Sequence, residues 1–229
     1  MVKSTSENAL TNSQKKKPDR PKKKRPKPSV TVRRAQKSVS SPVRAVFLVG
    51  FMGAGKSSVG RALGQSLNWL FEDLDDRIER REHRSIAEIF RKSGESAFRQ
   101  AEHEALREVL QELRRGGTRV IALGGGAFVQ SNNAVLLKAA GVPTVFLDAP
   151  VEELWQRCCR QATESGTDRP LLRSQDQFRE LHRDRRKSYR KASVRIETGG
   201  RPIDDIAAEI VRKLRLKKIT IRNEQGEVE

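Results

Sequence analysis

The chain contains little of several residue types, and each shortage excludes a class of protein. Only two of its 229 residues are cysteines, the adjacent Cys158 and Cys159. Neighbours on a helix point about 100° apart, so this pair predicts neither a disulfide nor a metal site and favours a reducing cytoplasm. No run of about 20 apolar residues occurs, and residues 1–40 lack the apolar core of a secretory signal. We therefore expect no contact with a membrane.

Aromatic and acidic residues are scarce at the N-terminal end. Residues 1–44 contain no aromatic side chain and carry 14 Lys and Arg against two acidic residues. Such a composition cannot bury enough apolar area to offset the entropy of ordering. We expect a disordered basic Lys/Pro-rich tail over residues 1–44, one domain over 45–216, and a mostly polar C-terminal tail over 217–229.

The charge of the basic tail raises two interpretations. It predicts salt-sensitive binding to nucleic acid or another polyanion, because such binding releases counterions. Charge runs are also commonly solvated segments without a defined partner. We favour the second interpretation.

Five short apolar runs alternate with helical patterns, and this alternation indicates the fold class. The runs are Ala45–Val49, Trp69–Phe71, Arg119–Leu123, Pro143–Leu147 and Val194–Ile196. The pattern is typical of an α/β domain with a largely parallel sheet. Ligands of such sheets bind at the carboxyl ends of the strands, so the polar residues that follow each run are the candidates for a site.

A complete phosphate-binding loop follows the first apolar run. Gly50–Ser57 reads Gly-Phe-Met-Gly-Ala-Gly-Lys-Ser and opens onto a helical pattern. Its backbone N–H groups can cradle phosphate oxygens, Lys56 can reach the β- and γ-phosphates, and the Ser57 hydroxyl can ligate Mg²⁺. The loop predicts ATP binding by Gly53, Ala54, Gly55, Lys56, Ser57 and Ser58.

Two further strand ends carry candidate residues. Asp73 and Asp75 share one face of an extended chain, where one carboxylate can hold Mg²⁺ through water and the other can orient a hydroxyl or accept its proton. A solvated turn with Asp76 as helix cap is the alternative. Gly124–Gly126 would allow a ligand to approach the backbone closely, and a flexible turn is the alternative there.

Two arginines stand out by their setting. Arg99 follows Phe98 at the start of a long amphipathic pattern. Arg169 follows a polar, glycine-containing stretch, Gln161–Asp168, of the kind that closes over phosphoryl-transfer sites. An arginine on such a lid can neutralise charge on the transferred group, and a solvated surface is the alternative for both residues.

Taken together, these motifs resemble those of the shikimate kinase family, and the resemblance runs from about Val46 to Leu214. The matching stretches are Gly50–Arg61, Phe71–Ile78, Ser85–Phe90, Gly94–Arg99 with Glu102, Leu123–Gly126, Arg169–Leu172 and Arg185-x-x-x-Tyr189. The resemblance implies a three-layer α/β/α sandwich of the P-loop kinase type with a five-stranded parallel sheet. It also implies Mg²⁺-dependent transfer of the ATP γ-phosphate to the 3-hydroxyl of shikimate, in aromatic amino-acid biosynthesis. We expect a monomer.

The resemblance implies roles for individual residues. The catalytic positions fall on Lys56, Asp75 and Arg169. The metal positions fall on Ser57 and, through water, on Asp73. The substrate positions fall on Asp75, Arg99, Gly124, Gly125, Gly126 and Arg185. Arg157 falls near the adenine-stacking arginine of the family, and Arg169 falls at its lid arginine.

The chain departs from the family in two places, and alternatives to the family's activity stay open. His83 replaces a glycine that the family uses as a left-handed helix cap, and a proline is missing between Arg185 and Tyr189, so that Arg183 and Arg186 compete with Arg185 for its role. The alternatives are a kinase of another small polyol acid, such as gluconate, and a non-catalytic ligand sensor.

Overall fold

The computed structural model describes residues 43–165 and 174–219. Residues 1–42, Arg169 and residues 220–229 lie outside this part of the chain, and the predictions made for them stay predictions. Within the described residues, no helix is both long and apolar enough to cross a bilayer.

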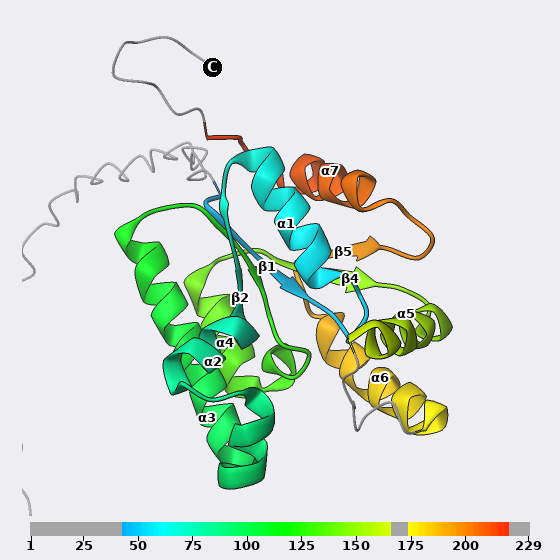
Figure 1. The fold of residues 1–229 in the computed structure, drawn as a ribbon. Helices are drawn as coiled ribbons and strands as arrows, with labels where there is room; N and C mark the ends of the chain where they lie inside the picture. The colour runs from blue at the N-terminus through cyan, green and yellow to red at the C-terminus, as the bar shows by residue number, and fades with distance from the viewer. Residues whose placement is uncertain (1–42, 166–173, 220–229) are drawn as a thin grey trace, which may run out of the picture. The chain divides into compact units, whose positions relative to one another are not determined.

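A five-stranded sheet forms the centre of the domain (Figure 1). Its strands, all parallel, lie in the order β2-β3-β1-β4-β5. They are β1 (Ala45–Val49), β2 (Leu70–Asp73), β3 (Arg119–Ala122), β4 (Thr144–Asp148) and β5 (Val194–Glu197). Each predicted apolar run matches a strand to within two residues, which confirms the predicted fold class.

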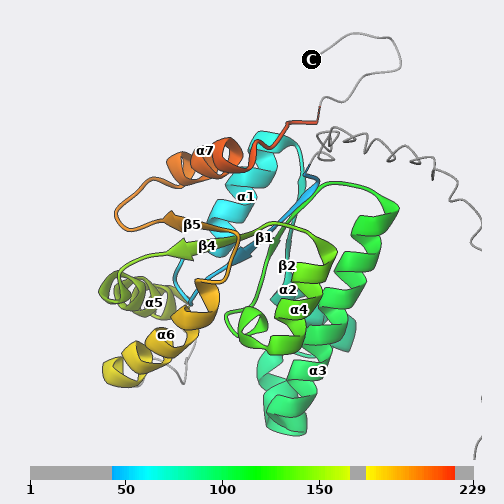
Figure 2. The ribbon, with the colours of Figure 1, turned by 180° about the vertical axis from the view of Figure 1, so that it is seen from behind.

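Helices cover both faces of the sheet. They are α1 (Lys56–Leu67), α2 (Leu74–Glu82), α3 (Ile86–Arg115), the short 3₁₀ helix η1 (Ala127–Val129), α4 (Ser131–Ala140), α5 (Val151–Ser165), α6 (Gln175–Tyr189) and α7 (Ile203–Leu214). The pair α1 and α7 lies on one face, and α3 and α4 lie on the other (Figures 1 and 2). The domain is therefore the predicted three-layer sandwich.

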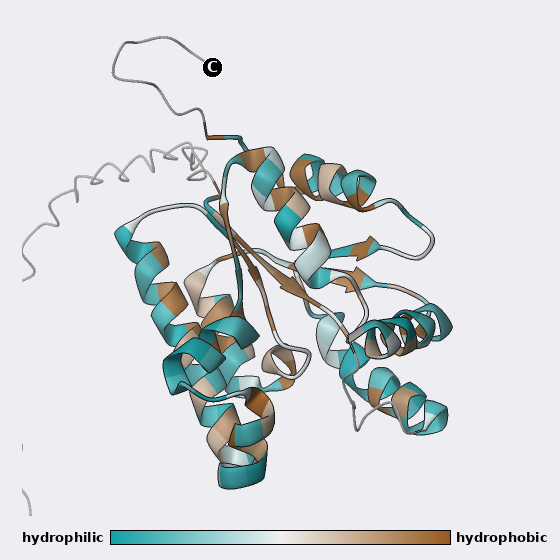
Figure 3. Cartoon of the chain, viewed as in Figure 1, coloured by the Kyte–Doolittle hydropathy of each residue, from teal (hydrophilic) through white to brown (hydrophobic). Residues whose placement is uncertain are grey.

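The core lies along the central strands. All residues of β1 and of β4 are buried, as parallel strands covered on both faces must be. Figure 3 shows this as apolar strands flanked by helices whose polar sides face outward. Most of the predicted site residues lie at or just after the carboxyl ends of β1, β2 and β3, where this rigid core supports them.

Local signals shape the segment between β2 and β3. His83 ends α2 in the left-handed conformation (φ 51°) that was predicted for it. Ser85 and Glu88 form a capping box at the start of α3, as a serine followed three residues later by a glutamate predicts. Gly94 (φ 80°, ψ 174°) then kinks α3. Arg99 lies shortly after this kink, and its guanidinium lies against Gly126, which follows β3.

The prediction that Asp73 and Asp75 share one face of an extended chain is wrong. The strand ends at Asp73, and α2 begins at Leu74, so the two carboxylates are separated by a helix start. Asp73 caps that helix by accepting a hydrogen bond from the backbone N–H of Asp75 at 3.1 Å. The cap forms because it satisfies one of the first N–H groups of the helix, and it takes the place proposed for Asp76.

Candidate active site

The phosphate-binding loop joins the end of β1 to the start of α1, and its conformation needs glycine. Gly53 has φ 76°, and a Cβ on it would lie 2.8 Å from the carbonyl oxygen of Leu154. Gly50 has φ 152°, and its Cβ would lie 2.7 Å from the carbonyl oxygen of Leu147. These close approaches let the loop wrap in front of the N-terminus of α1, where an anion is favoured.

Lys56 and Ser57 begin α1 and lie inside this loop. The Lys56 ammonium donates hydrogen bonds to the carbonyl oxygens of Gly50 and Phe51, each at 3.1 Å. Burial lowers the pKa of Lys56, and the carboxylates of Asp75 and Asp73 oppose that shift. The Ser57 hydroxyl donates to Asp73 at 2.8 Å, so the structure brings together the hydroxyl and the carboxylate that were predicted for the metal.

Asp75 is a strongly perturbed carboxylate of the site. Burial raises its pKa to about 6, the charge of Asp73 adds to this shift, and Lys56 opposes it. Its buried Oδ1 accepts no hydrogen bond from any described residue. Since buried polar atoms are normally bonded, this oxygen is available to a ligand. It lies 2.5 Å from where a Cβ on Gly124 would be, so the glycine leaves it room.

Gly124–Gly126, here called the glycine wall, follow β3 and receive side chains from two helices. Arg99 of α3 would collide with a Cβ on Gly126, and the Arg185 Nη1 atom of α6 would lie 3.3 Å from a Cβ on Gly125. The Tyr189 hydroxyl donates to the carbonyl oxygen of Gly125. The wall is therefore a bare backbone surface toward which two guanidinium groups converge.

The structure selects Arg185 from the three neighbouring arginines of α6. Arg183 points outward, with 69% of its side chain exposed, and pairs with Glu180. Arg186 pairs with Asp148 at the end of β4. Arg185 alone of the three reaches the glycine wall.

Glu102 is a site residue to which the sequence assigned no role. It is fully buried on α3, and its Oε2 accepts a hydrogen bond from Arg99 at 3.0 Å. Burial raises its pKa, and Arg99 opposes that shift. An acidic residue on the apolar stripe of a helix, three positions after an arginine, was the available signal.

Arg157 of α5, which the resemblance places near the adenine-stacking arginine of the family, lies beside the phosphate-binding loop. Its guanidinium donates to the carbonyl oxygens of Gly53 at 3.4 Å and Thr198 at 3.2 Å, and it pairs with Glu153. Arg169, the predicted lid arginine, is outside the described residues.

Few of the described residues could ligate a metal ion in this site. Among the described residues, no cluster of three or more His, Cys, Asp or Glu side chains could hold one. The Ser57–Asp73 pair nevertheless fits Mg²⁺, because this ion prefers oxygen donors and usually takes one or two from the protein and the rest from water and phosphates.

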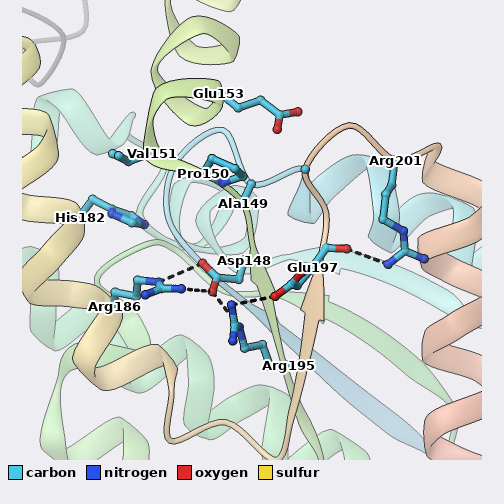
Figure 4. Close-up of a pocket in the computed structure, with 11 residues that line it drawn as sticks. Asp148, Ala149, Pro150, Val151, Glu153, His182, Arg186, Arg195, Glu197 and Arg201 are labelled. Atoms are coloured by element: carbon cyan, nitrogen blue, oxygen red, sulfur yellow. Dashed lines mark hydrogen bonds and ion pairs between the residues drawn. The ribbon is translucent and has the colours of Figure 1, made fainter.

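A cavity of about 500 Å³ lies at the carboxyl ends of β4 and β5, between α5 and α6 (Figure 4). None of the predicted site residues lines it. Its lining includes Asp148, His182, Arg186, Arg195 and Glu197, most of which are engaged with one another.

Comparisons with known proteins agree with this geometry. The family model for shikimate kinase matches residues 52–215. The chain is 45% identical over 176 residues to the shikimate kinase of Geobacter metallireducens, covering 76% of this chain and 93% of that protein. It is 40% identical over 183 residues to the shikimate kinase of Thermus thermophilus, covering 79% and 95%. A solved shikimate kinase from Acinetobacter baumannii in complex with shikimate has a TM-score of 0.67 and 36% identity, covering 76% and 93%.

The matched region holds the phosphate-binding loop from Met52 onward, the aspartates after β2, the glycine wall and α6. It covers nearly the whole described domain. The chain therefore belongs to the shikimate kinase family of ATP-dependent phosphotransferases.

Proposed function

We propose that this chain transfers the γ-phosphate of ATP to the 3-hydroxyl of shikimate and so makes shikimate 3-phosphate. The observation that carries the proposal is the convergence of Arg99, Arg185 and the unpartnered Asp75 oxygen on the glycine wall. Two guanidinium forks suit a carboxylate, and a buried carboxylate suits a hydroxyl. The wall thus offers partners for both ends of a small hydroxy acid.

On the nucleotide side, the backbone of Gly53–Ser58 and the Lys56 ammonium bind the phosphates. Lys56 would exchange its bonds to Gly50 and Phe51 for phosphate oxygens, since both carbonyls belong to the same loop. Arg157 contacts the adenine from the rim of the loop. Arg169 neutralises charge on the transferred group.

Ser57 and Asp73 hold Mg²⁺, Asp73 through water. When bound, the ion neutralises charge on the phosphates of ATP. The chain's own part is to keep the hydroxyl and the carboxylate adjacent, which the 2.8 Å contact between them already does.

Asp75 orients the attacking hydroxyl and accepts its proton. With a pKa of about 6 the carboxylate is ionised at neutral pH and is a better base than an exposed aspartate. Because Asp75 has a buried oxygen and lies beside Lys56, the proton that it accepts stays next to the phosphate-binding loop.

The decisive experiment measures ADP release from Mg-ATP with shikimate, with gluconate and without an acceptor. Release that depends on shikimate supports the proposal. Release with gluconate alone would mean that the arginines hold another polyol acid. Tight shikimate binding without release would indicate a sensor, although a sensor does not need Lys56 and Asp75, and both are present.

Two wider proposals complete this function. We infer a cytoplasmic enzyme from the adjacent Cys158 and Cys159, which favour a reducing compartment. We infer a monomer because all predicted site residues that the structure describes belong to one domain, so that no second copy is needed to complete the site. Sedimentation at micromolar concentration tests the second statement, and a dimer would contradict it.

A further inference from the structure

A buried ion pair lies beside the active site without belonging to it. Asp148 ends β4 with only 4% of its side chain exposed. Its two oxygens accept hydrogen bonds from Arg186 Nε at 3.2 Å and Arg186 Nη2 at 2.6 Å, and from Arg195 Nε at 2.8 Å. Figure 4 shows Arg186 reaching this carboxylate from α6 and Arg195 reaching it from β5. A two-point contact of this kind fixes direction as well as distance.

The helix that carries Arg186 also carries substrate-facing residues. Phe178 and His182 of α6 pack edge-on against Phe51 of the phosphate-binding loop, with ring centroids 4.9 Å and 5.2 Å apart. One turn further on, Arg185 lies 5.9 Å from the same ring, and Tyr189 bonds to the glycine wall. Helix α6 therefore contacts the loop and the wall at once.

Arg185 and Arg186 lie on the two flanks of this contact stripe. Consecutive residues are separated by about 100° around a helix, so one side chain faces the wall and the other faces the end of β4. The apolar contacts between the flanks have no directional preference. Resistance to a roll of α6 about its axis comes from its directional contacts. Two of them are well shielded, Tyr189 to Gly125 and Arg186 to Asp148. A third, Arg179 to Glu152 of α5, is an exposed ion pair at 3.5 Å and contributes little.

A small roll would matter for the reaction. Side chains extend about 5–6 Å from the helix axis, so a roll of roughly 10° moves a guanidinium by about 1 Å. A displacement of this size is enough to impair a reaction that depends on positioning.

We propose that Asp148 and Arg186 are positioning residues, which fix the rotation of α6 and thereby present Arg185 and Tyr189 to the glycine wall. The proposal rests on the proposed function in taking Arg185 as a substrate-binding residue. It concerns this chain's own support for that residue, because no proline stiffens the segment between Arg185 and Tyr189.

The first test separates substrate binding from turnover. Arg186→Met should raise the KM for shikimate about five- to tenfold and leave kcat and the KM for ATP within about twofold. Arg186→Lys keeps the positive charge but loses the planar guanidinium fork, so its KM for shikimate should lie between that of the parent and that of Arg186→Met. The matched control is Arg183→Met, one turn away on the exposed side of α6, which should change nothing. Equal rises in both KM values, or no rise, would overturn the proposal.

A double-mutant cycle tests the partner. Asp148→Asn should reproduce the effect of Arg186→Met, and the two changes together should cost no more in shikimate KM than either alone. Additive effects would mean that the residues act independently and would refute the pair.

A second readout does not depend on the identity of the substrate. Tyr189 is the only tyrosine of the chain, and burial raises its pKa to about 12. With ¹³C at the ring carbon that bears the hydroxyl, NMR of the full chain should show a single phenol signal that shifts in Arg186→Met and not in Arg183→Met. An unshifted signal would contradict the positioning role even if shikimate proved not to be the substrate. A shifted signal in an enzyme without shikimate turnover would refute the proposed function alone.

Discussion

At the scale of single residues, Asp75 is a side chain whose acid–base chemistry is strongly changed by its surroundings. It lies at the first turn of α2, close to Asp73, Lys56 and the glycine wall, and one of its oxygens accepts no hydrogen bond from the described residues. Such a group costs folding energy while it is charged, and active sites commonly tolerate that cost.

Asp75→Asn should lower turnover by roughly 10²–10⁴-fold, because the amide cannot accept the proton. The fold should survive, and the circular-dichroism spectrum should match that of the parent. The pKa of Asp75 is raised, so its charge destabilises the native state progressively as the pH rises from about 4 to about 6. The variant should therefore melt roughly 6–12 °C above the parent at pH 8 and close to it at pH 4, because a shift of this size corresponds to about 3 kcal/mol. A variant that has lost its helical spectrum would make Asp75 a structural residue.

The same carboxyl predicts the pH dependence of the reaction. Protonation of Asp75 removes the base, so kcat/KM for shikimate should fall tenfold per pH unit below about pH 6 and level off above it. A pH profile measured at saturating Mg-ATP checks this limb. If kcat/KM began to fall only near pH 4, the carboxyl would titrate as an exposed aspartate does, and the prediction would be wrong.

Arg99→Lys is expected to weaken shikimate binding selectively. Arg99 is held by the buried Glu102 and by Glu95, each at 3.0 Å, and a lysine can satisfy both only as a point charge. The KM for shikimate should rise roughly tenfold, and the affinity for ATP should not change. Equilibrium binding of each ligand measures the two separately, and an equal loss of ATP affinity would refute the assignment to the substrate carboxylate.

At the scale of elements, the site depends on loops that are held against rigid strands. The segment that carries Asp75 and Arg99 is fastened to the sheet by an ion-pair network. Arg77 of α2 and Arg119 of β3 both bind Glu72 of β2 and Glu112 of α3. This network spans four elements, so it holds α2 and α3 in place as a unit beside the glycine wall.

The phosphate-binding loop supplies a prediction at this scale. Gly53→Ala would adopt a strained φ and push its Cβ against the Leu154 carbonyl oxygen at 2.8 Å and the Cys158 sulfur at 2.9 Å. It should reduce ATP affinity about tenfold or more and cost about 1–3 kcal/mol of unfolding free energy. Gly141→Ala is the matched control, because Gly141 has φ 67° but no neighbour within 4 Å of its Cβ. The control should lose only about 1 kcal/mol and no ATP affinity, and similar losses in both variants would exclude the close contact as the cause.

At the scale of the whole molecule, the uneven charge is the feature that the active site does not explain. The chain has a formal net charge of +18, and residues 1–44 hold most of it. A chain that begins near Pro42 should keep shikimate turnover within about twofold of the full chain, because the described site residues all come after Val49.

The truncation also tests the two interpretations of the basic tail. If the tail binds polyanions, the full chain should bind RNA with an affinity that falls steeply with salt, and removal of residues 1–44 should abolish most of it. Equal RNA affinity in both proteins would leave the interpretation that we favour, in which the tail is a solvated segment without a defined partner.

The elements of local origin could be predicted from the amino-acid sequence. The phosphate-binding loop, the capping box at Ser85, the left-handed His83 and the strand positions follow from interactions between residues close in the chain, so motif and periodicity predicted them. The exception, the separation of Asp73 from Asp75, arose because a helix cap formed between them and ended the strand two residues earlier than an extended face would need.

Contacts between side chains that are distant in the chain depend on how the helices and strands pack. The choice of Arg185 over its neighbours depends on the rotation of α6, the burial of Glu102 depends on α3 lying against the glycine wall, and the pairing of Asp148 with Arg186 joins residues 38 apart in the chain. Periodicity identifies the buried face of a helix but not the element that covers it. The rotation of a helix that brings a side chain to its partner is set by packing against the whole fold. The phosphate-binding loop can therefore be predicted from eight consecutive residues, whereas the substrate site cannot be predicted from any single segment.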